Sequence, residues 1–320
     1  MWKFIVRRIL IMIPQIIVLS LLIFLMAKAM PGDPFTGLID PSVDPNTIAE
    51  LRENAGLNDP WYQQYARWAT NAIQGDFGQS FRHKIPVTDL IDQKLWNTVW
   101  LSLLSLIFTY LMAIPLGITS GRFNDSIADR LISGYTYVGF AAPTFIVGLL
   151  VLYLFGFQLG WFPTGGSVSP GATPGTFSYV IDKFNHLFLP SLSIAVLTTV
   201  STVQYLRSEI IDTKQKDFIL TVRSKGASES RVYNRHILRN SVLPIAAFFG
   251  YEITGLIGGT IFIENIYSYP GMGQLFFQSI NLRDYSVVTA LVLLFGVASI
   301  IGTLLSDIIL SIVDPRIRIK

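Results

Sequence analysis

The stretch RSEIIDTKQKDFILTVRSKGASESRVYNRHILRNSVLP, residues 207–244, is strongly charged in a chain that is otherwise mostly apolar. It holds eight Lys or Arg and four Asp or Glu. Its pattern predicts a helix over Thr213–Lys225 that ends at Gly226, because glycine adopts left-handed backbone angles without a steric penalty. Ser228 is placed to cap a second, short helix, with Glu229 in the first turn. We therefore expect a two-helix docking element; the alternative is a solvated loop between two membrane spans.

The composition indicates a membrane protein. Hydrophobic residues make up 51% of the 320 residues, charged residues make up 14%, and the mean hydropathy is +0.49. The absence of cysteine excludes a disulfide framework and thiol chemistry. The net charge is only +3, and the basic residues group by membrane side, whereas nucleic-acid binding needs them on one soluble face.

Six apolar stretches approach or exceed the roughly 20 residues that cross a bilayer as a helix. They are Ile9–Ala27, Leu95–Gly117, Gly134–Leu159, Leu187–Leu206, Ser241–Ile263 and Ser286–Val313. The first could also be a cleavable signal peptide, but it is longer than the usual apolar region of about 7 to 15 residues. We expect it to be retained, which gives an all-α membrane protein with six transmembrane helices.

The distribution of basic residues predicts the orientation of these spans. With the N-terminus inside, the cytoplasmic pieces hold 16 Lys or Arg and the outer pieces hold 7. Both termini and the charged stretch are then cytoplasmic. The chain divides into a tail and first span (1–30), a large extracytoplasmic segment (31–94) and a five-helix core (95–320) with a cytoplasmic loop at 207–239. Within the outer segment, Trp61–Ile73 has the pattern of an interfacial helix.

Several kinds of chemistry lack their sequence signals. No glycine-rich loop ends in Lys followed by Ser or Thr, so the chain has no ATP site of that kind. The histidines, His83, His186 and His236, are far apart and fall on both sides of the predicted membrane, which argues against a metal site. Signals of a serine hydrolase or a zinc protease are also missing. We expect no enzyme activity and no cofactor in this chain.

Three acids lie in or beside the predicted spans: Glu252, Glu264 and Asp307. A carboxylate that faces lipid costs roughly 2.5 kcal/mol or more at the bilayer centre, so these side chains are expected to face the bundle interior, a partner or a water-filled path. They are candidates for the translocation path, and Glu252 is the best candidate to contact a cationic or amine-bearing solute. The alternative, strongest for Asp307, is hydrogen bonding between helices.

With these features in view, the charged stretch resembles the ATPase-docking loop of ABC importer permeases. The general motif of that loop is poorly matched at Leu220, Thr221 and Val222, but the pattern of the dipeptide and oligopeptide (peptide/nickel) branch is present. It is matched by Arg223, Lys225, Gly226, Arg235, His236, Arg239, Asn240 and Pro244. Five further motifs of that branch occur in the right order: Pro31–Pro34, Gly75–Gly78 with Ser80, Leu159–Pro163, Pro270–Gly273 and Asp314–Arg316.

The resemblance implies a type I ABC importer permease bundle of the first-permease subtype. It implies a second homologous permease, two ATP-binding subunits that carry ATP and Mg, an extracytoplasmic solute-binding protein, and a peptide or similar small solute. The expected setting is the lipid of the cell (inner) membrane. The ATPase-coupling residues would be Arg223, Lys225, Gly226, Ser228, Glu229, Arg231, Arg235, His236 and Arg239.

Two other classes stay open from the sequence. A secondary transporter driven by an ion gradient could use the membrane acids as proton relays, although no repeat of two spanning halves is visible. A channel or scaffold also fits six spans, but no selectivity-filter motif is present.

Overall fold

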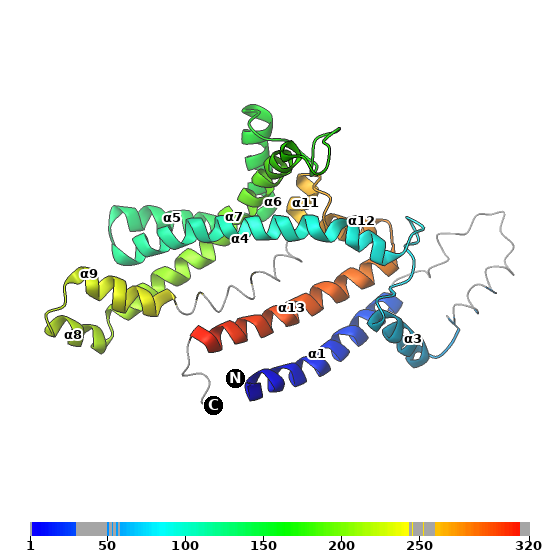
Figure 1. Cartoon of the computed structure of the whole chain (residues 1–320), viewed down its shortest axis with the longest axis horizontal. Coiled ribbons are helices and arrows are strands. Elements are labelled where there is room, and N and C mark those ends of the chain that lie inside the picture. Colours follow the sequence, from blue (N-terminus) through cyan, green and yellow to red (C-terminus); the bar gives the residue numbers. More distant parts are fainter. Residues whose placement is uncertain are drawn as a thin grey trace.

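A computed structural model of the chain describes residues 2–29, 58–242 and 260–313, together with the single positions 50, 53, 56, 245 and 252. The described parts are mostly helical (Figure 1). The long helices are α1 (Trp2–Ala29), α4 (Val87–Arg122), α7 (Phe177–Lys214) and α13 (Tyr285–Val313). The shorter ones are α3 (Trp61–Ile73), α5 (Ile127–Ala141), α6 (Thr144–Val151), α8 (Asp217–Ser224), α9 (Glu229–Arg231), α11 (Ile261–Ile266) and α12 (Met272–Asn281), with π-helical segments η2 (Leu152–Gln158) and η3 (Val232–Ile237).

The centre of the molecule is the pair α4 and α7, which pack against each other along much of their length. Glycines make this approach close: a Cβ at Gly117 would lie 2.9 Å from the Leu206 side chain, and one at Gly121 would lie 2.7 Å from Cβ of Ile210. Small residues at a helix interface let two backbones come together in a membrane bundle. Helices α4 and α7 are therefore tightly packed together near the C-terminal end of α4.

The predicted third span is not one straight helix. It is divided into α5 and α6, which meet at an angle of 110°, and α6 runs on into η2. The break falls at Ala142–Pro143, where Ala142 is extended at φ −81° and ψ 122°. A residue before proline is driven away from helical angles, and proline itself has no N–H to donate. Among the described residues, four helices are long and apolar enough to cross a membrane, or five if this bent pair is one span.

Helix α7 is longer than the predicted fourth span. The predicted fourth span, Leu187–Leu206, is the middle of the 38-residue helix α7, which extends into the charged stretch as far as Lys214. The predicted helix over Thr213–Lys225 is therefore split, and only Asp217–Ser224 belongs to α8. The predicted fifth span, Ser241–Ile263, lies mostly outside the described residues.

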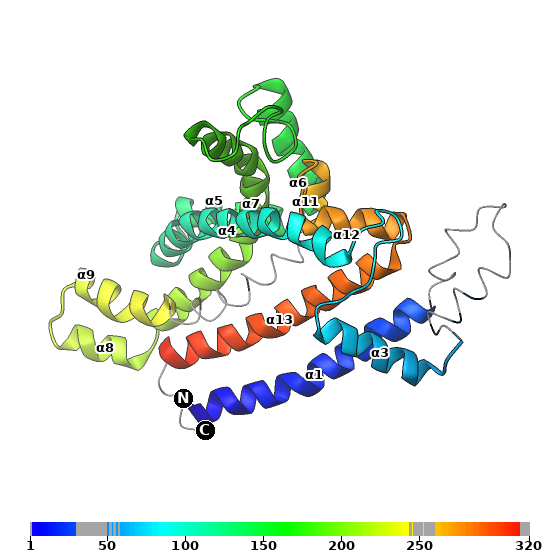
Figure 2. The ribbon, with the colours of Figure 1, turned by 45° about the vertical axis from the view of Figure 1, so that its right-hand side comes forward.

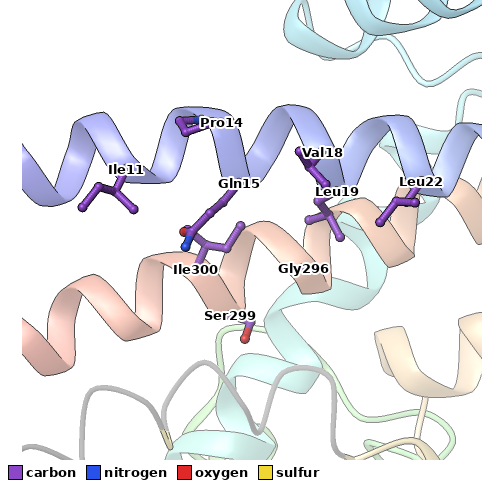
Figure 3. A pocket seen from close by; sticks show the side chains of 9 residues that line it. All are labelled: Ile11, Pro14, Gln15, Val18, Leu19, Leu22, Gly296, Ser299 and Ile300. Carbon is purple, nitrogen blue, oxygen red and sulfur yellow. The ribbon is translucent and has the colours of Figure 1, made fainter.

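Helix α1 lies at the edge of the structure, where it packs on α13 and on α3 (Figure 2). Ser20 of α1 is hydrogen-bonded to the Tyr65 hydroxyl of α3 at 2.8 Å, and Phe24 lies edge-on to the Tyr65 ring. A groove of about 630 Å³ lies between α1 and α13 (Figure 3). Its lining holds no charged side chain: Ile11, Pro14, Gln15, Val18, Leu19, Leu22, Gly296, Ser299 and Ile300.

The long axis of the molecule separates two groups of elements. The start of α1, the last turns of α13 and the α8–α9 region lie toward one end, while α3 and α12 lie toward the other (Figures 1 and 2). The long helices run between these ends, so the charged stretch and the aromatic helix α3 stand on opposite sides of the helical bundle.

Candidate functional site

The coupling insert, as we call residues Asp217–Ile237, consists of α8, a turn at Gly226, α9 and η3. Gly226 has a φ of +75°, and the amides that follow α8 turn back onto it. Gly226 N–H donates to the Arg223 carbonyl at 2.9 Å, and Ala227 N–H donates to the Val222 carbonyl at 3.4 Å. This pair of bonds is a Schellman motif, which satisfies the last carbonyls of a helix. The predicted helix stop at Gly226 is confirmed.

The inner face of the coupling insert is a small apolar core. Ile219 and Val232 are fully buried, and Ile237 is nearly so. They pack on Leu206 and Ile210 in the C-terminal part of α7. Burying a side chain of this size stabilises the folded state by roughly 1.5–3 kcal/mol. The insert is thus a folded element seated on α7 and not a solvated loop.

The outer face of the coupling insert carries the charges. Arg223 holds Glu229 across the turn through two hydrogen bonds, Nε to Oε1 at 2.9 Å and Nη2 to Oε2 at 3.2 Å. Ser228 has the extended backbone of an N-cap, but its side chain makes no capping hydrogen bond. The remaining predicted coupling residues differ in exposure: Lys225, Arg231, Arg235 and Arg239 are exposed and His236 is half-buried.

Two apolar side chains of α8 are also exposed, one on each side of the buried Ile219. Phe218 is 39% exposed and Leu220 is 57% exposed. Together with the exposed basic residues they form a surface that is partly apolar and strongly basic. Such a surface suits a partner protein with an acidic, partly apolar cleft, because charge complementarity gives specificity and apolar contact gives affinity.

The Glu252 side chain contacts one residue of α4 and one residue of α7. Its carboxylate accepts a hydrogen bond from the Tyr110 hydroxyl at 2.5 Å and one from Thr202 Oγ1 at 3.5 Å. The side chain is half-buried, and none of the ion pairs found among the described residues includes it. A carboxylate whose donors among the described residues are two hydroxyls keeps acceptor capacity for a cationic group.

Glu264 is fully buried and caps helix α12. It accepts hydrogen bonds from Thr98 Oγ1 at 2.8 Å, Thr260 Oγ1 at 2.6 Å and Gln274 N–H at 2.9 Å. A Cβ at Gly271 would overlap this carboxylate. The Pro270–Gly273 motif is thereby explained: its glycines make room for a carboxylate at a helix N-terminus, where negative charge is favourable. The place of Glu264 in a translocation path stays a prediction.

Asp307 of α13 lies against α1. Its Oδ2 is 3.0 Å from Nη1 of Arg8. This ion pair joins the first and last described helices and matches the alternative of a contact between helices. Because the three acids lie in three separate settings, the structure does not bring them together as one site.

One important acid was not singled out from the sequence. Asp129 at the start of α5 is 2% exposed and accepts two hydrogen bonds from Arg207 of α7, at 2.7 Å and 2.8 Å. Asp129 also accepts hydrogen bonds from Ser120 Oγ and from the Asp125 N–H. Nothing in the local sequence distinguishes Asp129 from other acids of a short loop, because its main partner is far away in the chain.

A metal centre is not indicated in the parts of the chain that the structure describes, where no three His, Cys, Asp or Glu side chains gather. The groove between α1 and α13 holds only the side-chain amide of Gln15 and the hydroxyl of Ser299 as polar side-chain groups (Figure 3). It therefore lacks the polar lining that a water-filled path for a hydrophilic solute requires.

The comparisons with known proteins agree with this geometry. Residues 113–319 match the family described as "Binding-protein-dependent transport system inner membrane component", and residues 1–102 match its N-terminal part. The chain is 39% identical, over 99% of its length and the whole of the relative, to the oligopeptide transport system permease protein AppB of Bacillus subtilis (strain 168). It is 32% identical, over both full lengths, to the glutathione transport system permease protein GsiC of Escherichia coli (strain K12).

Solved structures show the same fold. A chain of the inward-facing MetNI methionine ABC transporter aligns with a TM-score of 0.54 at 14% identity, covering 70% of this chain and 96% of that one. A chain of an amino acid ABC transporter solved with histidines aligns with a TM-score of 0.50 at 16% identity, covering 72% and 94%.

The helical bundle and the seated, charged insert define a permease subunit of an ABC importer. More specifically, the chain belongs to the family of binding-protein-dependent transport system inner membrane components. In this family the permease is the transport component and a separate subunit hydrolyses ATP, so the chain is not itself an enzyme. Family membership replaces the gradient-driven transporter and the channel as explanations of the spans.

Proposed function

We propose that this permease imports oligopeptides or dipeptides. The observation that carries the proposal is the 39% identity to an oligopeptide permease over almost the whole chain. The five branch motifs support it, since they run from the outer segment to the last residues. The permease would form the path together with a second, homologous permease, and an extracytoplasmic binding protein would deliver the solute.

The coupling insert would dock onto one of the two cytoplasmic ATPase subunits. Its exposed basic residues Arg231 and Arg235 would make the dock specific, while Phe218 and Leu220 would provide apolar contact. The buried core beneath keeps the insert stiff, as the conversion of ATPase closure into movement of the spans requires. ATP and Mg would be held by the ATPases.

In the proposed topology, both termini and the coupling insert lie in the cytoplasm. Residues 31–94 lie on the extracytoplasmic side of the cell (inner) membrane. The excess of basic residues on the insert side supports it. The start of α1 and the last turns of α13 lie toward the same end of the bundle as α8 and α9 (Figure 2). The aromatic helix α3 at the opposite end would lie at the outer interface.

Glu252 is our candidate for solute contact along the path. A peptide presents an ammonium group at its N-terminus, and the Glu252 carboxylate, held by the Tyr110 and Thr202 hydroxyls, offers a negative partner without a basic neighbour among the described ion pairs. We do not extend this role to Asp307, whose charge is opposed by Arg8.

Reconstitution tests the function. The permease would be combined with its second permease, the ATPases and the binding protein in proteoliposomes, and uptake of labelled trialanine, dialanine and glutathione would be measured. ATP-dependent uptake of the alanine peptides that persists when the proton gradient is collapsed is expected. Uptake of glutathione alone would assign the chain to the other kind of relative, and uptake that needs no ATP would refute the proposal.

A further inference from the structure

The coupling insert touches more of the bundle than the helix from which it emerges. Besides its seat on α7, it reaches the cytoplasmic end of α4, which is far from it in the sequence. The guanidinium carbon of Arg122, the last residue of α4, lies 4.6 Å from the ring centroid of Tyr233 in η3. The Tyr233 hydroxyl donates to the Ile118 carbonyl at 3.4 Å. Tyr233 is 6% exposed, whereas Arg122 is exposed, so the ring is buried beneath a guanidinium that faces solvent.

A second contact closes the same end of α4. Lys214, the last residue of α7, donates from Nζ to the Gly121 carbonyl at 2.8 Å, the Arg122 carbonyl at 2.9 Å and Asn124 Oδ1 at 2.7 Å. The last carbonyls of a helix have no partner within the helix, and a cation there also suits the helix dipole. Lys214 therefore fixes the end of α4 to the segment that leads into the coupling insert.

The opposite end of α4 contacts the outer part of the structure. Asn97 Nδ2 donates to the Pro270 carbonyl at 3.0 Å, and Thr98 Oγ1 accepts from Met272 N–H at 2.8 Å while it donates to Glu264. Val87 and its neighbours on α4 share a buried cluster with α12 and α13. Helix α4 has 36 residues, which at about 1.5 Å per residue is about 54 Å, well beyond the roughly 30 Å of a hydrocarbon core.

We infer that Tyr233 and Arg122 are positioning residues that connect the coupling insert directly to α4, and that α4 carries the movement of the insert across the membrane to the α11–α12 segment. The inference rests on the proposed function, because it needs an ATPase that moves the insert. The insert is joined to the bundle along the chain in two places, through α7 before it and through the residues after η3. The contact with α4 adds a third, non-covalent connection. Gly117 and Gly121 pack closely on Leu206 and Ile210 of α7, and the insert is seated on the same two residues, so α4, α7 and the insert are joined at one place.

Matched variants in the complete reconstituted importer test this route. Tyr233→Ala and Arg122→Ala are expected to lower trialanine uptake per ATP hydrolysed by about fivefold, the scale of one lost cation–π contact. Tyr233→Phe and Arg122→Lys keep a ring and a cation and are expected to stay near the wild type. Tyr137→Ala, which removes an exposed tyrosine of α5, is the control and is expected to have no effect.

A distance measurement separates coupling from a merely structural role. Spin labels at Gln93 on the outer part of α4 and at Thr70 on α3, both exposed, are expected to change separation when vanadate traps the ATPases with nucleotide. In Arg122→Ala the change is expected to be lost although the ATPases still trap nucleotide. If Tyr233→Ala does not assemble, the Arg122 pair decides, since Arg122 is exposed and outside the core.

The outcomes are distinguishable. An unchanged ratio of uptake to hydrolysis in both alanine variants, or equal losses in the conservative variants, would overturn the α4 route while leaving the importer intact. If the wild-type complex shows no ATP-driven peptide uptake, the proposed function is refuted, and the α4 route is refuted with it.

Discussion

Replacing Gly226 by alanine perturbs the coupling insert in a way whose magnitude follows from the structure. The φ of +75° lies in the left-handed region, where an L-residue with a Cβ pays about 1–2 kcal/mol. No heavy atom lies within 4 Å of the added Cβ, so the change introduces no clash. The cost is therefore purely conformational, and at about 1 kcal/mol it lowers the equilibrium ratio of the native turn to the open turn about fivefold.

Hydrogen exchange measures this equilibrium between the native and the open turn. In Gly226→Ala, peptides that cover α8 and the turn are expected to exchange about fivefold faster, because local opening becomes easier by that factor. Gly226→Asn is expected to fall between glycine and alanine, since asparagine tolerates left-handed angles better. Gly226→Pro is expected to be worst, because it also removes the N–H that bonds to the Arg223 carbonyl at 2.9 Å.

The matched control is Gly171→Ala in the loop before α7. Gly171 has a φ of +85° and likewise no atom within 4 Å of an added Cβ. Its substitution is expected to loosen its own loop by a similar amount and to leave exchange in the insert and uptake per ATP unchanged. Wild-type exchange in Gly226→Ala, or an asparagine variant no better than alanine, would refute the conformational reasoning.

Three further predictions follow from the site. Charge reversal at Arg231 and Arg235 is expected to leave the permease assembled, because both side chains are exposed, and to reduce ATPase co-purification and uptake severalfold; normal values would contradict the docking role. Gly271→Ala is expected to destabilise the fold by about 1–3 kcal/mol, because the new Cβ overlaps a buried carboxylate, whereas Gly134→Ala, with open space around it, is expected to be neutral or stabilising in thermal unfolding. Glu252→Gln is expected to slow uptake of free trialanine more than of N-acetylated trialanine, and uptake of both peptides at the wild-type rate would remove Glu252 from solute contact.

The sequence predicts well those features that depend on neighbours in the chain. The stop at Gly226 needs only the backbone freedom of glycine and a helical pattern before it, and the structure confirms it. The same holds for the long apolar helices. The bend at Pro143 is different: a proline inside an apolar run indicates a kink, but not its size. Here Gly148, one turn into α6, packs under Ile263, where a Cβ would meet the Ile263 side chain at 2.7 Å, and such contacts fix the angle.

Features that depend on distant partners could not be predicted. Glu264 is visible in the sequence as an acid at the end of an apolar segment, which suggested a path. One of its donors, Thr98, is 166 positions earlier, and the glycines that make room for it belong to a motif whose purpose is not visible locally. Asp129 was overlooked for the same reason, since its significance comes from Arg207, which is 78 positions away.

The packing of α1 has a consequence for the order in which the chain folds. Its described neighbours are α13, late in the sequence, and the short helix α3, and its Arg8 pairs with Asp307 of α13. Ser80, in the segment that follows α3, is likewise bonded to Asp284, 204 positions later. Synthesis proceeds from the N-terminus, so α1 is made before α13 and cannot complete this packing until α13 has been made. The packing of α1 is therefore among the last contacts of the bundle to form. A chain truncated before α13 would expose the α13-facing side of α1 to lipid or to quality-control proteases.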